Sequence, residues 1–362
     1  MGSPLKEHVD YGAVVRLADA IAAVDSLFDA PAFIADASGP LHLLELKARI
    51  DHLASALDRQ LAGPFERAAR ILCTAASQAE LDMWTAWPCV TFLERRGLDS
   101  PEAALSALAC LTRYASGEFA IRAFLERHPR ATFARLEEWA THEDVHVRRL
   151  VSEGTRPRLP WARQLATLRH DPSVVLPLLD QLHNDPEPYV RRSVANHLND
   201  IAKDHPSLAV SLGQRWLAGG GAHAQWVVRH GLRSLIKAGN QEALALVGAD
   251  IAAEVEVHDL RIETATVRLG DALHFSFAVR NPTDCPARLV IDYVIHHRRA
   301  NGSTSPRVFK LSTRMMPPGA VIVMRRAHAF RPVTTRRYYA GDHRLEIQVN
   351  GRVVAGVTFQ LA

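Results

Sequence analysis

The sequence predicts a chain of two parts, an α-helical solenoid of HEAT-like repeats followed by an immunoglobulin-like β-sandwich. Two observations predict this order. A short motif recurs at a spacing of roughly forty residues, the period of two-helix repeats. Near Asp250 the spacing of apolar residues then changes from helical to alternating. We place the helical domain at residues 1–252 and the sandwich at residues 256–362, because 362 residues suffice for two domains with sizeable cores.

The composition is that of an ordinary globular protein, with 48% hydrophobic and 23% charged residues. No apolar run is long enough to span a bilayer, and the N-terminus shows no signal-peptide pattern. The four cysteines form no CxxC pair: Cys73, Cys89, Cys110 and Cys285. We therefore expect reduced thiols, a cytoplasmic location and no membrane partner.

The net charge of +4 is unevenly distributed along the chain. Residues 251–362 contain 16 Lys and Arg against 9 Asp and Glu. Between Ile291 and Arg344 there are 11 basic residues, and the only acidic ones are Asp292 and Asp342. This excess suggests a polyanionic partner, although a basic protein without such a partner has the same composition.

The first 115 residues read as helices. Apolar residues recur at helical spacing in three segments: Val14 to Phe28, Leu41 to Leu61 and Pro64 to Gln78. Asp99 or Ser100 can cap a further helix that begins at Pro101. We assign two tryptophans here to packing rather than to stacking on a ligand: Trp84 and Trp87.

A helix is then expected from Phe119 to Arg127, with Ser116 as its N-cap. Glu118 would fall in the first turn, where the helix dipole favours an anion. Taken alone, this structural explanation of Glu118 is preferred to a catalytic one.

The repeated motif begins after His128. The segment Val147-Arg148-Arg149-Leu150-Val151 recurs as Val190-Arg191-Arg192-Ser193-Val194 and, more weakly, as Val228-Arg229-His230-Gly231-Leu232. In the first copy the apolar positions face the core. Each copy also has a polar stripe: Arg149, Glu153 and Arg156; Arg192, Asn196 and Asp200; His230, Ser234 and Lys237. We expect these stripes to form one ridge on a concave surface, which suits a phosphate backbone.

The segment from His146 to Trp161 is the candidate active-site turn. Its only carboxylate is Glu153, and four arginines are close in sequence: Arg148, Arg149, Arg156 and Arg158. Arg149 and Glu153 are four residues apart, so an exposed ion pair of a few tenths of a kcal/mol is the competing explanation.

The last hundred residues alternate between apolar and polar positions, as strands do. The clearest segments are Leu273 to Val279, Leu289 to Ile295 and Val321 to Val323. Asn350-Gly351 is a strong hairpin signal. Basic residues cluster at 296–299, 325–326 and 336–337, either in loops that present them to a partner or as charges that protect sheet edges.

Three sequence blocks resemble the AlkC branch of the HEAT-like-repeat alkylpurine DNA glycosylases. They are Glu118-Phe119-Ala120-Ile121-Arg122, the block from Val147 to Gly154, and Arg156-Pro157-Arg158-Leu159-Pro160-Trp161. The resemblance covers essentially the whole chain, including the order of helical repeats before an immunoglobulin-like tail.

This resemblance implies a monofunctional DNA glycosylase. It would hydrolyse the N-glycosidic bond of cationic alkylated bases, 3-methyladenine and 3-methylcytosine, in duplex DNA without drawing the base into a deep pocket. It implies no cofactor and no metal. It further implies a monomer whose partner is double-stranded DNA containing alkylated bases, cytoplasmic and nucleoid-associated when bound.

The chemistry of the candidate residues agrees with this resemblance. A cationic base leaves as a neutral group, so positive charge develops on the deoxyribose instead. One carboxylate about 4 Å away, at an effective dielectric of about 20, contributes about 4 kcal/mol, or about a thousandfold in rate. We expect Glu153 to be this carboxylate and Glu118 the second. Three residues would support them: Arg149 by orienting Glu153 or gripping a phosphate, Trp161 by packing on the sugar or base, and Asp200 by bounding the cleft.

The expected DNA-binding residues come from both parts of the chain: Arg148, Arg156, Arg158, Arg192, His230, Lys237, His296, Arg298, Arg299 and Arg337. A non-catalytic DNA-binding HEAT-repeat scaffold is the alternative function, followed by a protein-interaction solenoid. No Gly-rich phosphate loop, zinc-ligand spacing or serine-hydrolase motif supports another enzyme class.

Overall fold

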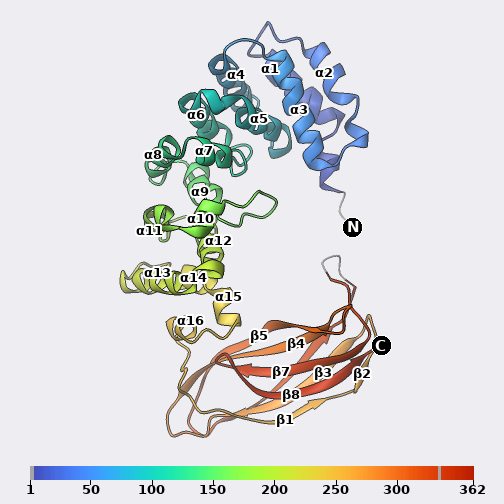
Figure 1. Ribbon diagram of the computed structural model, residues 1–362, viewed down its shortest axis with the longest axis vertical. Coiled ribbons are helices and arrows are strands. Elements are labelled where there is room, and N and C mark those ends of the chain that lie inside the picture. Colours follow the sequence, from blue (N-terminus) through green and yellow to red (C-terminus); the bar gives the residue numbers. More distant parts are fainter. Residues whose placement is uncertain (1–3, 333–335) are drawn as a thin grey trace. The chain divides into compact units, whose positions relative to one another are not determined.

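A computed structural model describes residues 4–332 and 336–362, and it shows a helical region followed by β-sheets (Figure 1). The contacts divide the chain into two compact units. The first unit ends at Asp204 and includes residues 221–223, and the second takes the remainder of the chain. The change from helix to strand therefore lies inside the second unit. No helix among the described residues is long and apolar enough to cross a membrane.

The first unit is built from α-helices joined by short turns (Figure 1). The helices are α1 Tyr11–Ala22, α2 Ala30–Ser38, α3 Leu46–Gln60, α4 Phe65–Gln78, α5 Met83–Arg96, α6 Pro101–Leu111, α7 Ile121–Arg127, α8 Pro129–Trp139, α9 Val145–Gly154, α10 Ala166–His170, α11 Leu176–Leu182 and α12 Pro188–Asp204. Four 3₁₀ turns are η1 Leu5–His8, η2 Leu41–Leu43, η3 Gly97–Asp99 and η4 Ser173–Val175. The predicted helix from Pro64 is confirmed within one residue, as α4.

Two predicted helices differ from the observed ones at their ends. Helix α1 begins at Tyr11 rather than Val14, because the Asp10 carboxylate caps it by accepting from the Ala13 amide. The segment predicted from Leu41 to Leu61 is divided into η2 and α3 by Leu44, whose backbone is extended.

The expected cap of α7 is wrong. The helix begins at Ile121, and the Ser116 hydroxyl donates to the Glu118 carboxylate instead of accepting from a backbone amide. The bonds from the Arg122 and Ala123 amides reach back only three residues, so the chain before α7 is an irregular turn. Glu118 lies in this turn, and side chains rather than a helix dipole fix its position.

The first two copies of the repeated motif are α9 and α12, which pack against each other. In both copies the first arginine holds the turn before its own helix. Arg148 donates to the carbonyls of His142 and Glu143. Arg191 donates in the same way to the carbonyls of Asp185 and Pro186. Arginine therefore recurs at this position of the motif because it stabilises the turn before each helix.

The third copy is not one continuous helix. Helix α14, Ala224–Gly231, ends at the glycine, and α15, Arg233–Lys237, begins after Leu232. Glycine is a poor helix former, which explains the break. The predicted stripe is thus divided, with His230 on α14 and Lys237 on α15.

The second unit contains α13 Pro206–Ala218, α14, α15, α16 Gln241–Leu246 and two β-sheets. The strands are β1 Glu256–Ile262, β2 Thr266–Val267, β3 Ala272–Arg280, β4 Ala287–Arg298, β5 Thr304–Met316, β6 Val321–Ala329, β7 Gly341–Val349 and β8 Arg352–Leu361. One sheet has the order β1-β3-β6 and the other β2-β8-β7-β4-β5. Their inward-facing residues, such as Phe277 and Ile347, form one core.

The predicted hairpin at Asn350-Gly351 is confirmed. It joins β7 and β8, and both residues have positive φ angles, 46° and 79°. The buried Asn350 side chain donates to the Asp250 carbonyl and accepts from the Val290 amide. A Cβ at Gly351 would lie 2.6 Å from the Gly239 Cα, so glycine is required there. This hairpin attaches the sandwich to the helical end of the second unit.

Three histidines are buried in the sandwich: His297, His328 and His343. Burial, followed by the charge of Arg336, lowers the pKa of His297 to about 3 and that of His328 to about 4. Burial also lowers the pKa of His343. The Arg336 guanidinium lies 2.8 Å from His297 Nε2, which suits a neutral ring that accepts a hydrogen bond.

We expect acid to destabilise the second unit. An unfolded histidine titrates near pH 6.5, so below that pH the unfolded state binds more protons than the folded one. The stability from these histidines is fully present above about pH 6.5. It is lost at about 1.4 kcal/mol per pH unit and group as the pH falls towards the folded pKa.

Asp292 opposes this loss, because burial raises its pKa to about 6. The three histidines together outweigh the one carboxyl, so the second unit should lose stability in acid. Thermal unfolding at pH 7.5 and pH 5.5 should show a lower melting temperature at pH 5.5, and His328→Gln should narrow the difference. Equal melting temperatures at the two pH values would contradict this assignment.

Candidate active site

A row of charged side chains, half-buried at Glu118 and Arg149 and buried from Glu153 to Asp200, connects the turn before α7 with α9 and α12. Arg149 lies between two carboxylates, 2.8 Å from Glu118 and 3.7 Å from Glu153. Arg156 lies between the next two, 2.7 Å from Glu153 and 2.9 Å from Asp200. The structure therefore brings together both predicted catalytic carboxylates and two of their predicted supporting residues. The exposed ion pair considered above does not describe Arg149 and Glu153, because their side chains are only 16% and 8% exposed.

The charges of the row are balanced by a third cation at its end. Two guanidinium groups lie between three carboxylates, and the Lys203 ammonium lies 3.0 Å from Asp200. Burial lowers the pKa of Arg149, but Glu153 and Glu118 outweigh burial and the net pKa is raised. The same balance raises the pKa of Arg156, with Glu153 and Asp200 as its partners. Both guanidinium groups therefore stay charged.

The two glutamates differ in their remaining hydrogen-bonding capacity. Glu153 is 6% exposed, with one oxygen bonded to Arg156 and the other accepting from the Ser193 hydroxyl at 2.6 Å. In Glu118, one carboxylate oxygen accepts from both Ser116 and Arg149. Within the described part of the chain, the other Glu118 oxygen has no hydrogen-bond partner. Glu153 is thus a fixed charge, and Glu118 has an oxygen free for water or substrate.

An aromatic face borders this row. The Arg149 guanidinium lies over the Tyr189 ring, 4.8 Å from its centroid. Tyr189 also makes an edge contact with His146 and is 40% exposed. The row therefore reaches the surface beside a large ring.

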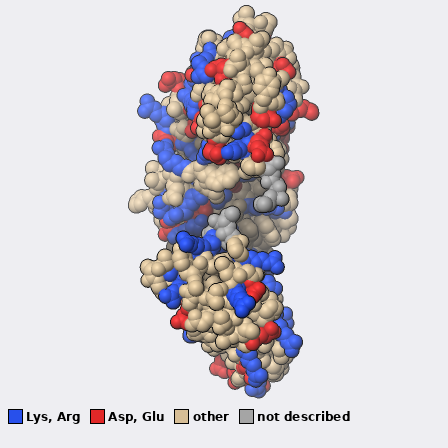
Figure 2. All heavy atoms as spheres, turned by 90° about the vertical axis from the view of Figure 1, so that its right-hand side faces the viewer, with Lys and Arg blue, Asp and Glu red and all other residues tan. Residues whose placement is uncertain are grey.

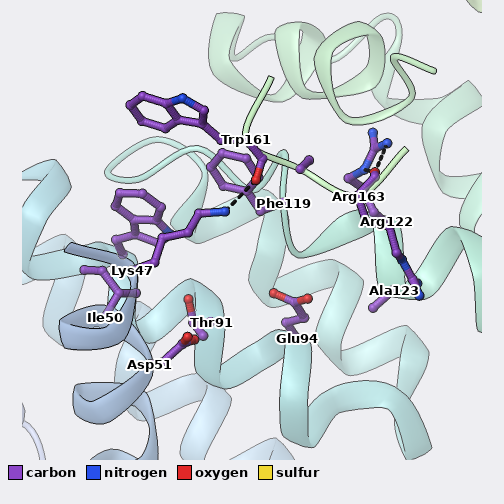
Figure 3. A pocket seen from close by; sticks show the side chains of 12 residues that line it. Lys47, Ile50, Asp51, Thr91, Glu94, Phe119, Arg122, Ala123, Trp161 and Arg163 are labelled. Atoms are coloured by element: carbon purple, nitrogen blue, oxygen red, sulfur yellow. Dashed lines mark hydrogen bonds between the residues drawn. The ribbon is translucent and has the colours of Figure 1, made fainter. Parts of the chain in front are cut away.

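The loop after α9 is held by two cations from other elements. Arg122 donates to the carbonyls of Gly154, Arg156 and Arg163. Lys47 Nζ donates to the Trp161 carbonyl at 2.5 Å (Figure 3). Trp161 is 68% exposed and has a φ of 65°, a conformation that a large residue adopts only when its surroundings impose it.

Several predicted DNA-binding arginines are occupied within the fold. Arg148 pairs with Asp185 at 2.7 Å, and Arg158 pairs with Asp204 at 2.6 Å. Arg156 belongs to the buried row described above. Arg156 is buried, so its guanidinium cannot reach a phosphate without losing its partners, whereas Arg148 and Arg158 are partly exposed and their DNA contacts remain predictions. Arg192 on α12 is exposed.

Of the four tail residues predicted to bind DNA, two are engaged within the fold and two are exposed. His296 pairs with Glu346 at 2.8 Å, and the Arg298 guanidinium packs against Gly341. Arg299 and Arg337 are exposed. On the face shown in Figure 2, basic and acidic side chains are interspersed over the first unit rather than gathered into one basic stripe.

Four residues of this site are not among those predicted to form it: Ser116, Arg122, Tyr189 and Ser193. The signal for Ser193 was present in the repeat, because it stands where the first copy has the buried Leu150. A hydroxyl at a core position needs a polar partner, and Glu153 is that partner. The other three gave no comparable signal.

Comparisons with known proteins agree with the fold. Residues 116–218 match the family described as DNA alkylation repair enzyme, and residues 256–362 match the C-terminal Ig-like domain of YhaZ. The uncharacterized protein YhaZ of Bacillus subtilis is 38% identical over 270 residues, 75% of each chain. A solved structure of Pseudomonas fluorescens alkylpurine DNA glycosylase AlkC, bound to DNA containing an abasic site analog, is 36% identical with a TM-score of 0.94. It covers 99% of this chain and 100% of that chain.

This chain belongs to the AlkC-like branch of the DNA alkylation repair enzymes. The match to AlkC includes both the helical region and the Ig-like sheets. All of the charged row lies within residues 116–218, the part that matches the DNA alkylation repair family.

Proposed function

We propose that this AlkC-like protein is a monofunctional DNA glycosylase. It hydrolyses the N-glycosidic bond of cationic alkylated bases, 3-methyladenine and 3-methylcytosine, in double-stranded DNA. The observation that supports this best is the pair Glu118 and Glu153, held on one guanidinium, Arg149, so that two carboxylates lie close together. The described relative AlkC, similar over its whole length, is an alkylpurine DNA glycosylase.

The geometry suits a reaction in which positive charge develops on the sugar. Glu153 supplies fixed negative charge, and its partners prevent it from turning away as that charge forms. Glu118 uses its free oxygen to orient the attacking water. The leaving base is neutral once the bond breaks, so no group is needed to protonate it.

The supporting residues have separate tasks in this proposal. Trp161 packs its exposed ring on the sugar or the base, where an aromatic face also favours a cation. Arg149 orients both glutamates. The sequence predicted that Asp200 bounds the cleft. In the structure Asp200 is buried, so it acts through Arg156 and does not line the cleft.

The direct test is to incubate the protein with duplexes that carry each methylated base and to score abasic sites. We expect release from the 3-methyladenine and 3-methylcytosine duplexes. A protein that binds these duplexes but leaves every base attached would be the non-catalytic scaffold instead.

We also propose that the helical domain, residues 1–252, and the sandwich, residues 256–362, both contact the DNA backbone. The tail contributes Arg299 and Arg337, which are exposed, and His296 and Arg298, which are half-buried. Arg192, His230 and Lys237 contribute from the helices. Basic residues that neutralise phosphates release counterions, and this makes binding dependent on salt.

The double variant Arg299→Ala, Arg337→Ala should flatten the salt dependence of DNA affinity. Each lost phosphate contact lowers the log–log slope by about 0.9, so the pair should lower it by about 2. Truncation at residue 256 is a poor substitute, because the Asn350 hairpin packs on the helical end of the second unit. The matched control is Arg261→Ala, Arg268→Ala, two exposed arginines of the same domain. An unchanged slope in the Arg299, Arg337 variant would remove both residues from the interface.

A further inference from the structure

A cavity of about 250 Å³ lies in the first unit, next to the charged row but separate from it. Helices α3 and α5, the segment around Phe119 and the loop around Trp161 form its walls (Figure 3). Its volume is slightly below the range of drug-sized ligand pockets, roughly 300–1,000 Å³. It therefore suits a small molecule of one or two rings.

Three of the twelve residues that line the cavity are aromatic, and five are charged. Trp87 and Phe119 stack with their centroids 5.8 Å apart and their planes 13° apart, and Trp161 lines the cavity beside them. The sequence predicts a packing role for Trp87, but in the structure its side chain is only half-buried and lines this cavity. Flat walls of this kind favour a planar ligand.

The charged residues around the cavity are nearly all engaged. Lys47 donates to the Trp161 carbonyl, and Arg122 donates to three carbonyls. Asp51 pairs with Arg95 at 2.8 Å, and Arg163 pairs with Glu126.

Glu94 is the exception. Within the described part of the chain its carboxylate has no hydrogen-bond or ion-pair partner, and Figure 3 shows it pointing into the cavity. Burial, and then the charge of Asp51, raises the pKa of Glu94. A half-buried carboxylate without a partner is stabilised by a hydrogen-bond donor from a ligand.

We propose that this cavity binds the free base that the enzyme releases, an amino-bearing methylated base such as 3-methyladenine. The ring lies beside the aromatic side chains of the cavity, and the amino group donates to Glu94. This inference rests on the proposed function for the identity of the ligand. The chemistry of the walls alone calls for a planar ring with a hydrogen-bond donor.

The cavity is joined to the charged row through the backbone. Phe119 follows Glu118 directly, and Arg122 donates to the carbonyl of Gly154, the residue after Glu153. A base that leaves the sugar near these glutamates would have a place to go within the same unit. Binding there would hold the base away from the abasic site.

The test is a titration of the protein with free 3-methyladenine, without DNA, followed by tryptophan fluorescence, since Trp87 and Trp161 line the cavity. We expect saturable quenching. Glu94→Met, which removes the acceptor, should weaken the affinity about tenfold or more, as for the loss of a hydrogen bond to a charged group. Glu102→Met, an exposed carboxylate on α6, is the matched control and should bind like the wild type.

A second pair of ligands tests the contact itself. Adenine should bind more tightly than hypoxanthine, whose carbonyl replaces the amino group. Equal affinities of the wild type and Glu94→Met for 3-methyladenine, or of the wild type for adenine and hypoxanthine, would overturn the proposal. If Glu94→Met does not fold, Glu94→Gln keeps the volume and should still weaken binding several-fold.

These outcomes are separable from those of the base-release assay. An active glycosylase that does not bind the free base would disprove only the role of the cavity. A protein that binds the free base through Glu94 but releases no base from DNA would disprove the proposed function and keep the binding site.

Discussion

Replacing Glu153 by glutamine is expected to slow base release about a thousandfold, while affinity for DNA with an abasic-site analogue stays nearly unchanged. A carboxylate at about 4 Å from the developing sugar cation contributes about 4 kcal/mol at an effective dielectric of about 20. Glutamine keeps the shape of the side chain and can still bond Arg156 and Ser193, so the site should keep its geometry. The measurement is the single-turnover rate on a duplex containing 3-methyladenine.

Glu143→Gln is the matched control, because Glu143 is an exposed carboxylate just before the same helix, and its rate should equal that of the wild type. A wild-type rate for Glu153→Gln would show that this residue is not the catalytic carboxylate.

Glu118→Ala should also slow the chemistry, because the attacking water loses its acceptor. If Glu118→Ala lowers only the melting temperature, Glu118 has a structural role alone.

The order of the two parts and the main segments could be read from the sequence because they depend on local patterns. Alternating residues predicted β3 and β4, and Asn350-Gly351 predicted the β7–β8 hairpin because two residues with positive φ are needed there. The copies at Val147 and Val190 identified α9 and α12 as neighbours in a repeat. These features need no knowledge of distant contacts.

The partners of the arginines could not be predicted in this way. Arg148, Arg156 and Arg158 look alike in sequence, yet their carboxylate partners lie 37, 44 and 46 residues away, at Asp185, Asp200 and Asp204. Only the packing of α9 and its following loop beside α12 decides which charges meet. A basic stretch therefore predicted DNA contacts for residues that the fold uses internally.

Arg156 is one of the arginines that the fold uses internally. Of the substitutions considered, its replacement should lower the stability most. Arg156→Met removes the cation between two buried carboxylates, Glu153 and Asp200. Breaking a buried ion pair by removing one partner typically costs about 3–5 kcal/mol, because the remaining charge is left uncompensated. For a unit of this size, the melting temperature should fall by about 10 °C or more.

The control is Arg158→Met, the same substitution two residues later. Arg158 pairs with Asp204 nearer the surface, where an ion pair is worth about 0–1 kcal/mol, so its melting temperature should change little. Adding Asp200→Asn to Arg156→Met should recover part of the lost melting temperature, because it removes one unpaired charge.

The fall in melting temperature caused by Arg156→Met should also be smaller at pH 5 than at pH 7.5. Carboxylates left without their cation have raised folded pKa values, so the folded state takes up protons and the penalty shrinks as the pH falls. Equal losses for the two arginine variants would mean that the buried row does not support the fold, and that Arg156 serves the site alone.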